Sequence, residues 1–358
     1  MEKLRNKMAL LDRIRLTEGA EFEYNEVAIL DAYKAADENK ASLAIKILSI
    51  LGGLLAMLAF LAFLFVAGLY NSEIGMVAVG GLSIASAIAI NKIYHKIILD
   101  TFSISIYITG FVLLAIGLSE MGLDENSIAM SIGLIALSAL VITQNYIVSF
   151  VSILILNGSF LFLLLNTEVY DLIHVYIAIT SFLLTYVFLN EAKIISATKK
   201  LAQLYYPIRI GVLISFIIGL SIVGKKGGLP LSQNYIWISS IVFISIGMYV
   251  VSVICKINGI TAAKTKGMLY VFSFLILLST LFSPAISGAM LLVLLCFLVN
   301  YKTGFVIGIL ALVYFVSQYY YDLNFTLLTK SILLMVSGVL FLACYLFTTK
   351  MLGNNEKI

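Results

Sequence analysis

The sequence predicts an all-α, polytopic integral membrane protein with about twelve transmembrane helices, short loops and both termini in the cytoplasm. Of its 358 residues, 61% are hydrophobic and 12% are charged, whereas soluble domains have about 45–50% apolar and about 25% charged residues. Residues 47–72, 126–167 and 267–301 are runs without Asp, Glu, Lys or Arg. Because a membrane span requires about 20 apolar residues, a chain with several such runs crosses the bilayer many times.

The longest uncharged runs divide into two spans each. Residues 126–167 would extend about 63 Å as one helix, about twice the hydrocarbon thickness, so we expect a turn at the polar Thr143-Gln144-Asn145. Pro284 interrupts the run 267–301, because proline lacks the backbone donor that a helix interior needs. The twelve expected spans are 47–70, 74–91, 100–119, 127–144, 146–166, 171–190, 207–224, 235–255, 267–283, 285–300, 303–321 and 330–349.

The distribution of charge predicts the orientation of these spans. With a cytoplasmic amino terminus, all of the 23 basic residues except Lys225, Lys226 and Lys330 fall on the cytoplasmic side, as the positive-inside rule predicts. The net charge of +4 follows from this loop asymmetry and gives no reason to expect a nucleic-acid partner. The bilayer itself is the partner that composition predicts.

Five segments are expected along the chain. Leu10, Leu11 and Ile14 share one helix face, so residues 1–42 are expected to form a cytoplasmic, amphipathic helical segment. A first membrane half, a cytoplasmic linker, a second membrane half and a cytoplasmic tail follow at 43–190, 191–206, 207–349 and 350–358.

The sequence contains no motif of a known enzyme class. The patterns G-x-S-x-G and H-E-x-x-H and the P-loop are absent. His95 and His174 lie far apart, and the three cysteines have no metal-binding spacing. We therefore expect no catalytic residue, no metal and no cofactor.

Three polar residues within the predicted spans are candidates for an intramembrane site, because an ionisable or strongly polar group in hydrocarbon requires a reason. Asp100 follows Lys96 by one helical turn, His174 follows Asp171 by three residues, and Asn157 lies in the middle of its span. Local pairing explains the first two, and Asn157 is as consistent with helix packing as with a substrate ligand.

A second candidate site lies in the loop before the last span. Tyr319, Tyr320, Tyr321 and Asp322 end one span, and Lys330 begins the next. An ion pair below an interfacial aromatic belt explains this group without a function. The alternative is a surface for contact with a protein partner.

The carboxy-terminal sequence resembles a family. The residues that carry the resemblance are Ser283-Pro284-Ala285-Ile286, Val299-Asn300-Tyr301, the stretch from Tyr319-Tyr320-Tyr321-Asp322-Leu323 to Thr326-Leu327-Leu328-Thr329-Lys330-Ser331, and Gly338. These motifs, with the first span from Ile45 to Phe63, are similar to an uncharacterised group of bacterial polytopic membrane proteins that is classed as a domain of unknown function. The resemblance implies location in the bacterial inner membrane. It also implies a gene neighbour that encodes a small membrane-anchored protein with a G-D-Y-x-x-L-x-Y motif.

The sequence is consistent with two functions of different classes. The leading prediction is a non-enzymatic membrane protein that binds or scaffolds a partner through the region from Tyr319 to Lys330. The alternative is a secondary transporter or carrier for a weakly polar or lipid-like solute. If Asp100, Asn157, His174 and Lys330 share one solvated pocket, the carrier is favoured, and if they pair locally, partner binding is favoured.

Overall fold

The computed structural model describes residues 43–322, with gaps at 94–96, 144, 226, 228, 233–234 and 261, and scattered positions between 328 and 342. The expected segments 1–42 and 350–358 lie outside the described residues, as do Lys330 and most of the expected last span. Within the described part the chain is helical and contains no strand. The all-α class is therefore confirmed for this part.

The helices follow one another through short connections. They are α3 (Leu43–Val66), α4 (Glu73–Ile93), α5 (Ile97–Glu120), α6 (Glu125–Ile142), α7 (Tyr146–Asn166), α8 (Ile173–Leu189), α9 (Glu191–Ala197), α10 (Lys199–Gly224), α11 (Ile236–Ile257), α12 (Ala263–Leu278), α13 (Pro284–Leu298) and α14 (Lys302–Asp322), with short 3-10 helices η1 (Leu69–Asn71) and η2 (Tyr170–Leu172).

Eight of the described helices are long and apolar enough to cross a membrane, and two shorter apolar helices accompany them. The eight are α4, α5, α6, α7, η2 with α8, α10, α11 and α14. A multi-pass membrane protein is the class that such a set of helices indicates.

The turns expected within the two long uncharged runs are present at the predicted positions. α6 ends at Ile142, and α7 begins at Tyr146. The side chain of Asn145 caps α7, because its Oδ1 accepts hydrogen bonds from the backbone N–H groups of Ile147 and Val148 at 2.9 and 3.3 Å. Pro284 is the first residue of α13, a position where its missing N–H costs no helical hydrogen bond.

The largest difference from an expected span is at the start of α10. The span was expected at 207–224, but α10 runs from Lys199 to Gly224 and continues through Pro207. The hydroxyl of Thr198 caps it by accepting a hydrogen bond from the N–H of Leu201 at 3.2 Å. Residues 191–206 are therefore largely helical, as α9 followed by the first two turns of α10.

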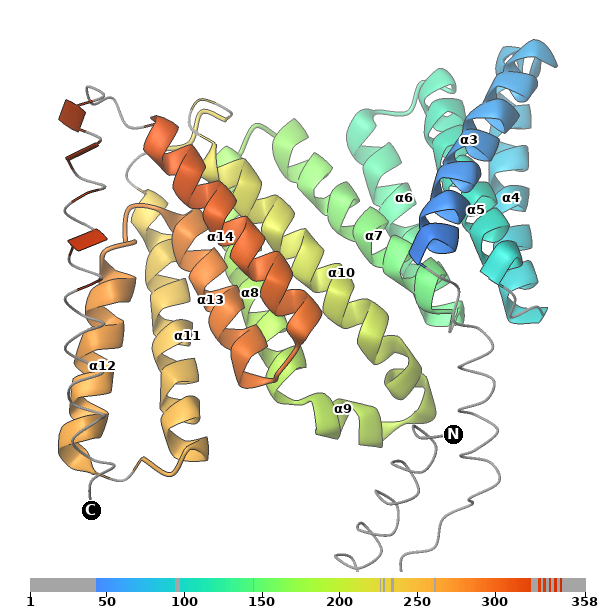
Figure 1. The fold of residues 1–358 in the computed structure, drawn as a ribbon. Helices are drawn as coiled ribbons and strands as arrows, with labels where there is room; N and C mark the ends of the chain where they lie inside the picture. Colours follow the sequence, from blue (N-terminus) through green and yellow to red (C-terminus); the bar gives the residue numbers. More distant parts are fainter. Residues whose placement is uncertain are drawn as a thin grey trace, which may run out of the picture.

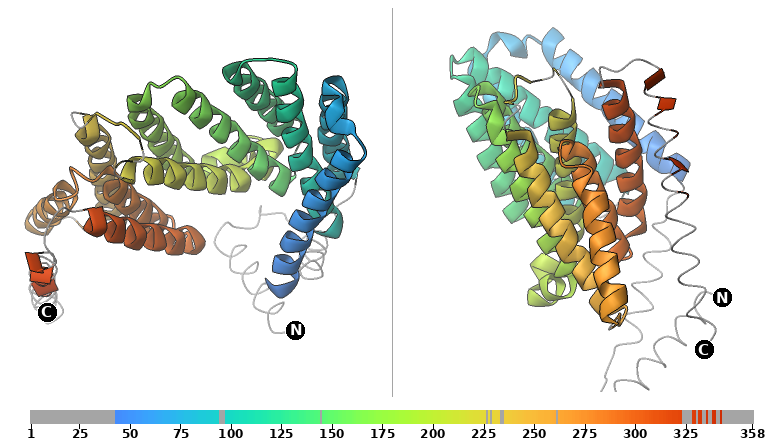
Figure 2. Two further views of the ribbon diagram at one scale, coloured as in Figure 1. Left: turned by 90° about the horizontal axis from the view of Figure 1, so that it is seen from above. Right: turned by 90° about the vertical axis from the view of Figure 1, so that its left-hand side faces the viewer.

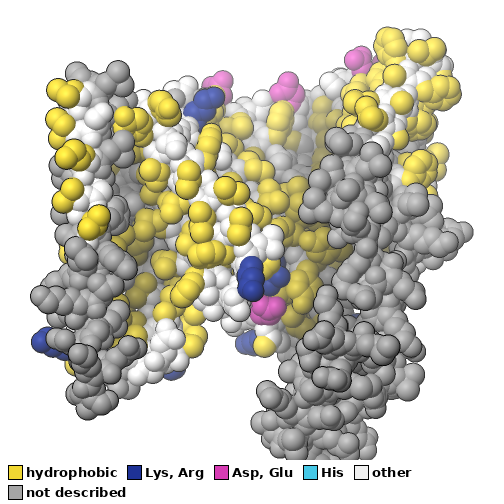
Figure 3. Space-filling view, viewed as in Figure 1, with side chains coloured by type: hydrophobic (Ala, Val, Ile, Leu, Met, Phe, Trp, Pro, Cys, Tyr) yellow, Lys and Arg dark blue, Asp and Glu magenta, His cyan; other side chains and the backbone are white. Residues whose placement is uncertain are grey.

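The described helices stand side by side in a curved row (Figures 1 and 2). We call the lower end in Figure 1 the basic end, because Lys193, Lys256 and Lys302 lie at its connections. The upper end is the acidic end, where Glu120, Asp124 and other acidic residues lie. Acidic side chains line the upper edge in Figure 3.

Two hydrophobic clusters hold the row together. One joins α4, α5, α6 and the first half of α7, and includes Tyr107 and Phe111. The larger one joins the second half of α7 to α8, α10, α11, α13 and α14, and includes Phe216 and Phe243 in edge-to-face contact. α7 therefore contributes to both clusters.

The cap of α6 predicts an acid-sensitive step in stability. Hydrogen bonds donated by the side chain and the backbone N–H of Ser127 lower the pKa of Asp124. A lowered pKa in the folded state stabilises the fold above the unfolded-state value of about 3.9, and this stability is lost as the pH falls through the folded-state pKa. We expect acidification from about pH 6 to about pH 3 to lower the Tm of the wild type more than that of Asp124→Ser, which keeps an uncharged cap. Equal decreases in Tm would contradict this.

Candidate functional site

An arginine lies within one of the eight helices that are long and apolar enough to cross a membrane. Arg209 is on α10, about 22 Å along the helix from its end at Gly224 at 1.5 Å per residue. Its side chain is 12% exposed, and Nη1 lies 3.6 Å from Oε2 of Glu191, whose side chain is 37% exposed. A cation held inside an apolar helix is costly and indicates a structural or functional role.

Three tyrosine rings surround the guanidinium group of Arg209. Its Cζ atom lies 5.2 Å from the ring centroid of Tyr205, 5.1 Å from that of Tyr206 and 3.9 Å from that of Tyr301. All three distances are within the range of cation–π attraction. We call Glu191, Tyr205, Tyr206, Arg209 and Tyr301 the arginine cage.

The local fold places each member of the cage. Tyr205 and Tyr206 precede Arg209 by four and three residues on α10, so they share its helix face. Glu191 is the first residue of α9. Tyr301 follows Asn300, whose φ of 53° lies in the left-handed region. The N–H groups of Tyr301 and Asn300 bond the carbonyls of Cys296 and Phe297 at 2.9 and 3.2 Å, which closes the end of α13 as a Schellman motif.

The position beside Tyr301 in α14 accepts only glycine. A Cβ atom on Gly304 would overlap the ring of Tyr301 and lie 2.8 Å from Sγ of Cys296. A Cβ atom on Gly308 would lie 3.2 Å from a methyl group of Val293 on α13. The Gly304-x-x-x-Gly308 spacing thus lets α14 approach α13 closely and leaves room for the Tyr301 ring.

Two polar atoms of the cage have no hydrogen-bond partner in the part of the chain that the structure describes. They are Nε of Arg209 and the phenol oxygen of Tyr205, which is 1% exposed. Glu191 begins α9, and Tyr301 lies in the connection between α13 and α14, so the cage lies toward the basic end of the bundle.

His174 and Asp171 do not pair with each other as expected. Asp171 accepts hydrogen bonds from the hydroxyl and N–H of Ser232 at 2.6 and 3.0 Å, and Nδ1 of His174 lies 3.0 Å from the hydroxyl of Ser239 on α11. His174 is buried, and its Nε2 has no partner among the described residues. Asp171 therefore joins η2 to the connection before α11, and His174 joins the start of α8 to the start of α11.

Asn157 packs α7 against α8. Its Nδ2 donates to the carbonyl of Ile153 at 2.9 Å, and its Oδ1 accepts from the hydroxyl of Tyr176 at 3.2 Å. The ring of Tyr176 also stacks on Phe160 at a centroid distance of 5.8 Å. These contacts satisfy both polar atoms of the amide, which is how a polar residue joins helices in a membrane.

The remaining candidate residues lie apart from these. Tyr319, Tyr320, Tyr321 and Asp322 end α14 at the acidic end, where Tyr321 is 78% exposed. The side chain of Asp100, in α5, and all of Lys330 lie outside what the structure describes. Asn157 and His174 each bond a different neighbouring helix, and neither lines the pocket between α8 and α11 or the pocket between α5, α6 and α7.

The sequence alone does not predict the arginine cage. Its pattern of charge groups Arg209 with the basic loops and assigns Glu191 to a cytoplasmic linker. The stretch Tyr205-Tyr206-Pro207-Ile208-Arg209 could have predicted part of the cage. If the helix extends before Pro207, the two tyrosines lie four and three residues before Arg209 and share its helix face. The contributions of Glu191 and Tyr301 come from other elements and require the fold.

Similarity to a known protein family extends over most of the chain. A family model described as a domain of unknown function (DUF4401) matches residues 42–351. No curated protein and no solved structure matches the chain.

Proposed function

The chain belongs to the DUF4401 family, and we propose that it is a non-enzymatic, multi-pass membrane protein that binds a partner through the outer surface of α14. The partner that we propose is a small membrane-anchored protein. The location is the bacterial inner membrane, crossed twelve times with both termini in the cytoplasm. The separation of lysines at the basic end from carboxylates at the acidic end supports this orientation.

The low burial of α14 is the observation on which this proposal rests. Of the eight long spans, α14 has the smallest buried share, 17%. It packs through a narrow stripe, Gly304, Gly308, Ala311 and Phe315. The rest of its surface, from Val306 to Tyr321, is largely exposed. A span with one packed stripe has a second face that another membrane helix can cover.

The aromatic end of α14 suits such a partner. Tyr319 is 36% exposed and Tyr321 is 78% exposed at the acidic end. Tyrosine gives a large contact area at low cost in side-chain entropy and often dominates interface energies. The region from Tyr319 to Asp322 is therefore the proposed centre of contact.

The carrier alternative has less support. A carrier needs polar groups that converge on a solute at mid-membrane. Here Asn157 bonds Tyr176, and His174 bonds Ser239, so each is used between neighbouring helices. Local pairing of this kind favours the binding proposal.

Site-specific photo-crosslinking in cells tests the binding proposal. A benzophenone amino acid in place of Tyr321 is expected to give one adduct of discrete mass that contains a small membrane-anchored protein. The same group in place of Tyr235, which is 48% exposed at the same end of the bundle, is the matched control and is expected to give none. Lipid adducts alone at position 321, or the same protein adduct at both positions, would overturn the proposal.

A further inference from the structure

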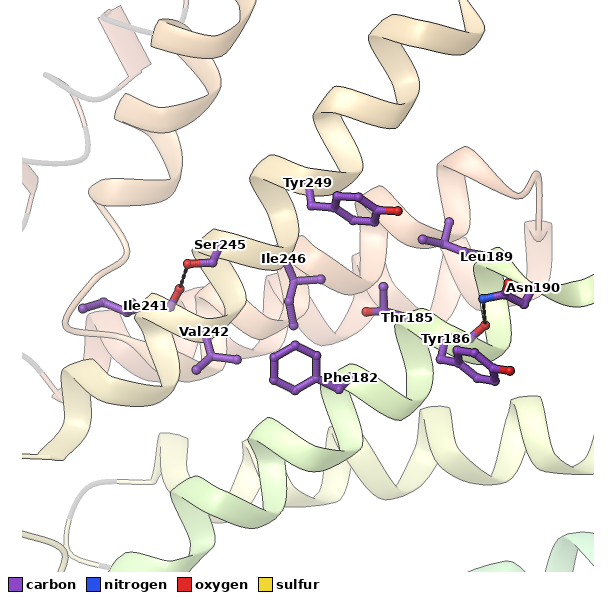
Figure 4. Close-up of a pocket in the computed structure, with 10 residues that line it drawn as sticks. All are labelled: Phe182, Thr185, Tyr186, Leu189, Asn190, Ile241, Val242, Ser245, Ile246 and Tyr249. Carbon is purple, nitrogen blue, oxygen red and sulfur yellow. Dashed lines mark hydrogen bonds between the residues drawn. The ribbon is translucent and has the colours of Figure 1, made fainter.

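An open groove lies between α8 and α11 on the surface of the bundle. Its volume is about 590 Å³, and its lining includes Phe182 and Tyr186 of α8 and Ile241, Ser245 and Tyr249 of α11. Figure 4 shows Phe182 from one helix facing Ile246 from the other in the middle of the groove. Its lining includes no member of the arginine cage and no tyrosine of α14, although Asn190 directly precedes Glu191.

The two aliphatic hydroxyl groups of the groove wall, those of Thr185 and Ser245, are already bonded to their own helix. The hydroxyl of Thr185 donates to the carbonyl of Ser181 at 2.7 Å, and the hydroxyl of Ser245 donates to the carbonyl of Ile241 at 2.8 Å. Since these donors are used, the wall presents a hydrocarbon-like surface. It therefore suits an apolar chain better than a polar solute.

One end of the groove is polar and basic. Figure 4 shows the phenol oxygens of Tyr186 and Tyr249 pointing toward the end where Asn190 lies. Lys256 follows Tyr249 by seven residues on the same face of α11, and Lys193 follows Asn190 by three residues; both lysines are exposed. Glu191, the acidic residue next to Asn190, is paired with Arg209.

We propose that this groove binds one anionic phospholipid from the leaflet at the basic end. The segments from Phe182 to Asn190 and from Ile241 to Tyr249 each extend about 12 Å along their helices, which accommodates the part of an acyl chain next to the head group. The phosphate lies at the end of the groove where Asn190 lies, close to Lys193 and Lys256. Charge complementarity identifies the lipid, because basic pockets between membrane helices bind anionic head groups.

The single tryptophan of the chain makes a fluorescence test direct. In the full-length protein, Trp237→Phe removes the native signal, and Tyr249→Trp places a new one in the groove. The protein is reconstituted in phosphatidylcholine vesicles that contain equal fractions of brominated phosphatidylglycerol or brominated phosphatidylcholine. We expect stronger quenching by the brominated phosphatidylglycerol, with a preference of about fivefold for each lysine that contributes.

Two controls separate this site from ordinary boundary lipid. Tyr314→Trp in the same background reports on α14, and Tyr249 and Tyr314 are both 56% exposed in the structure; we expect no preference there. Lys193→Gln with Lys256→Gln is expected to abolish the preference at position 249. Equal quenching by the two lipids at 249, the same preference at 314, or a preference that survives both lysine substitutions would overturn the proposal.

Discussion

Replacing Gly80 with alanine is expected to lower the free energy of unfolding by about 1–3 kcal/mol, the usual range for overpacking a tight contact. Gly80 lies on α4 where the backbone of α5 is closest. An added Cβ atom would lie 2.8 Å from the carbonyl oxygen of Gly110 and 3.0 Å from the N of Leu114. Both are backbone atoms, so the clash is relieved only if the two helices move apart. The buried contacts of Tyr107 and Leu114 in the first cluster would then loosen.

The neighbouring Gly81 provides the matched control. A Cβ atom on Gly81 would meet nothing within 4 Å, and alanine is the better helix former by up to about 1 kcal/mol. Gly81→Ala is therefore expected to leave stability unchanged or slightly raised. Reversible unfolding in mixed micelles of SDS and a mild detergent measures both variants. A neutral Gly80→Ala would show that α4 and α5 are not held this closely.

A third variant tests whether the separation of the helices is the cause. Gly110 lies at the same contact, on α5. A Cβ atom added to Gly110 would lie 2.8 Å from the carbonyl oxygen of Gly80. One outward shift of α4 relieves both clashes. The cost of Gly80→Ala with Gly110→Ala should therefore be smaller than the sum of the two single costs.

The positions of the spans were largely predictable from the sequence because apolar composition and length determine them. α7 begins and ends at the expected residues, 146 and 166, and the turn before it was visible in the polar residues around Asn145. α10 was expected too late, since Lys199, Lys200 and Pro207 resemble a loop. Composition does not show that Thr198 caps a helix there.

The partners of the polar side chains were less predictable. The spacing of Asp171 and His174 suggested a local pair, but Asp171 lies in η2, before α8 begins at Ile173. The two side chains therefore do not share a regular helix face, and Ser232 and Ser239 take their place as partners. Both serines are more than 60 residues away in sequence, so the pairing depends on how α11 packs against α8.

Breaking the ion pair between Glu191 and Arg209 is expected to have the second large effect on the free energy of unfolding. Glu191→Gln removes the counter-charge of Arg209 and is expected to cost about 1–2 kcal/mol in the free energy of unfolding. This is below the about 3–5 kcal/mol for breaking a fully buried pair, because the side chain of Glu191 is 37% exposed. The same unfolding assay measures the cost. Glu120→Gln, at an exposed carboxylate at the acidic end, should be neutral.

A double-mutant cycle assigns this cost to the pair. Arg209→Met removes the cation, and the partly exposed Glu191 can then turn to water. Adding Glu191→Gln to Arg209→Met should therefore cost much less than it does in the wild type, with a coupling energy of about 1 kcal/mol. Full additivity of the two substitutions would show that the 3.6 Å contact contributes nothing to stability.

Arg209→Lys separates the effect of charge from that of shape. Lysine keeps the positive charge near Glu191, but it lacks the planar guanidinium that lies 3.9 Å from the ring centroid of Tyr301. If stacking on the three rings matters, Arg209→Lys will lose about 0.5–2 kcal/mol, the range for cation–π contacts, and Tyr301→Leu will lose a similar amount in the wild type but little in the lysine variant. If Arg209→Lys is as stable as the wild type, attraction to Glu191 alone retains the arginine, and the rings serve only as packing.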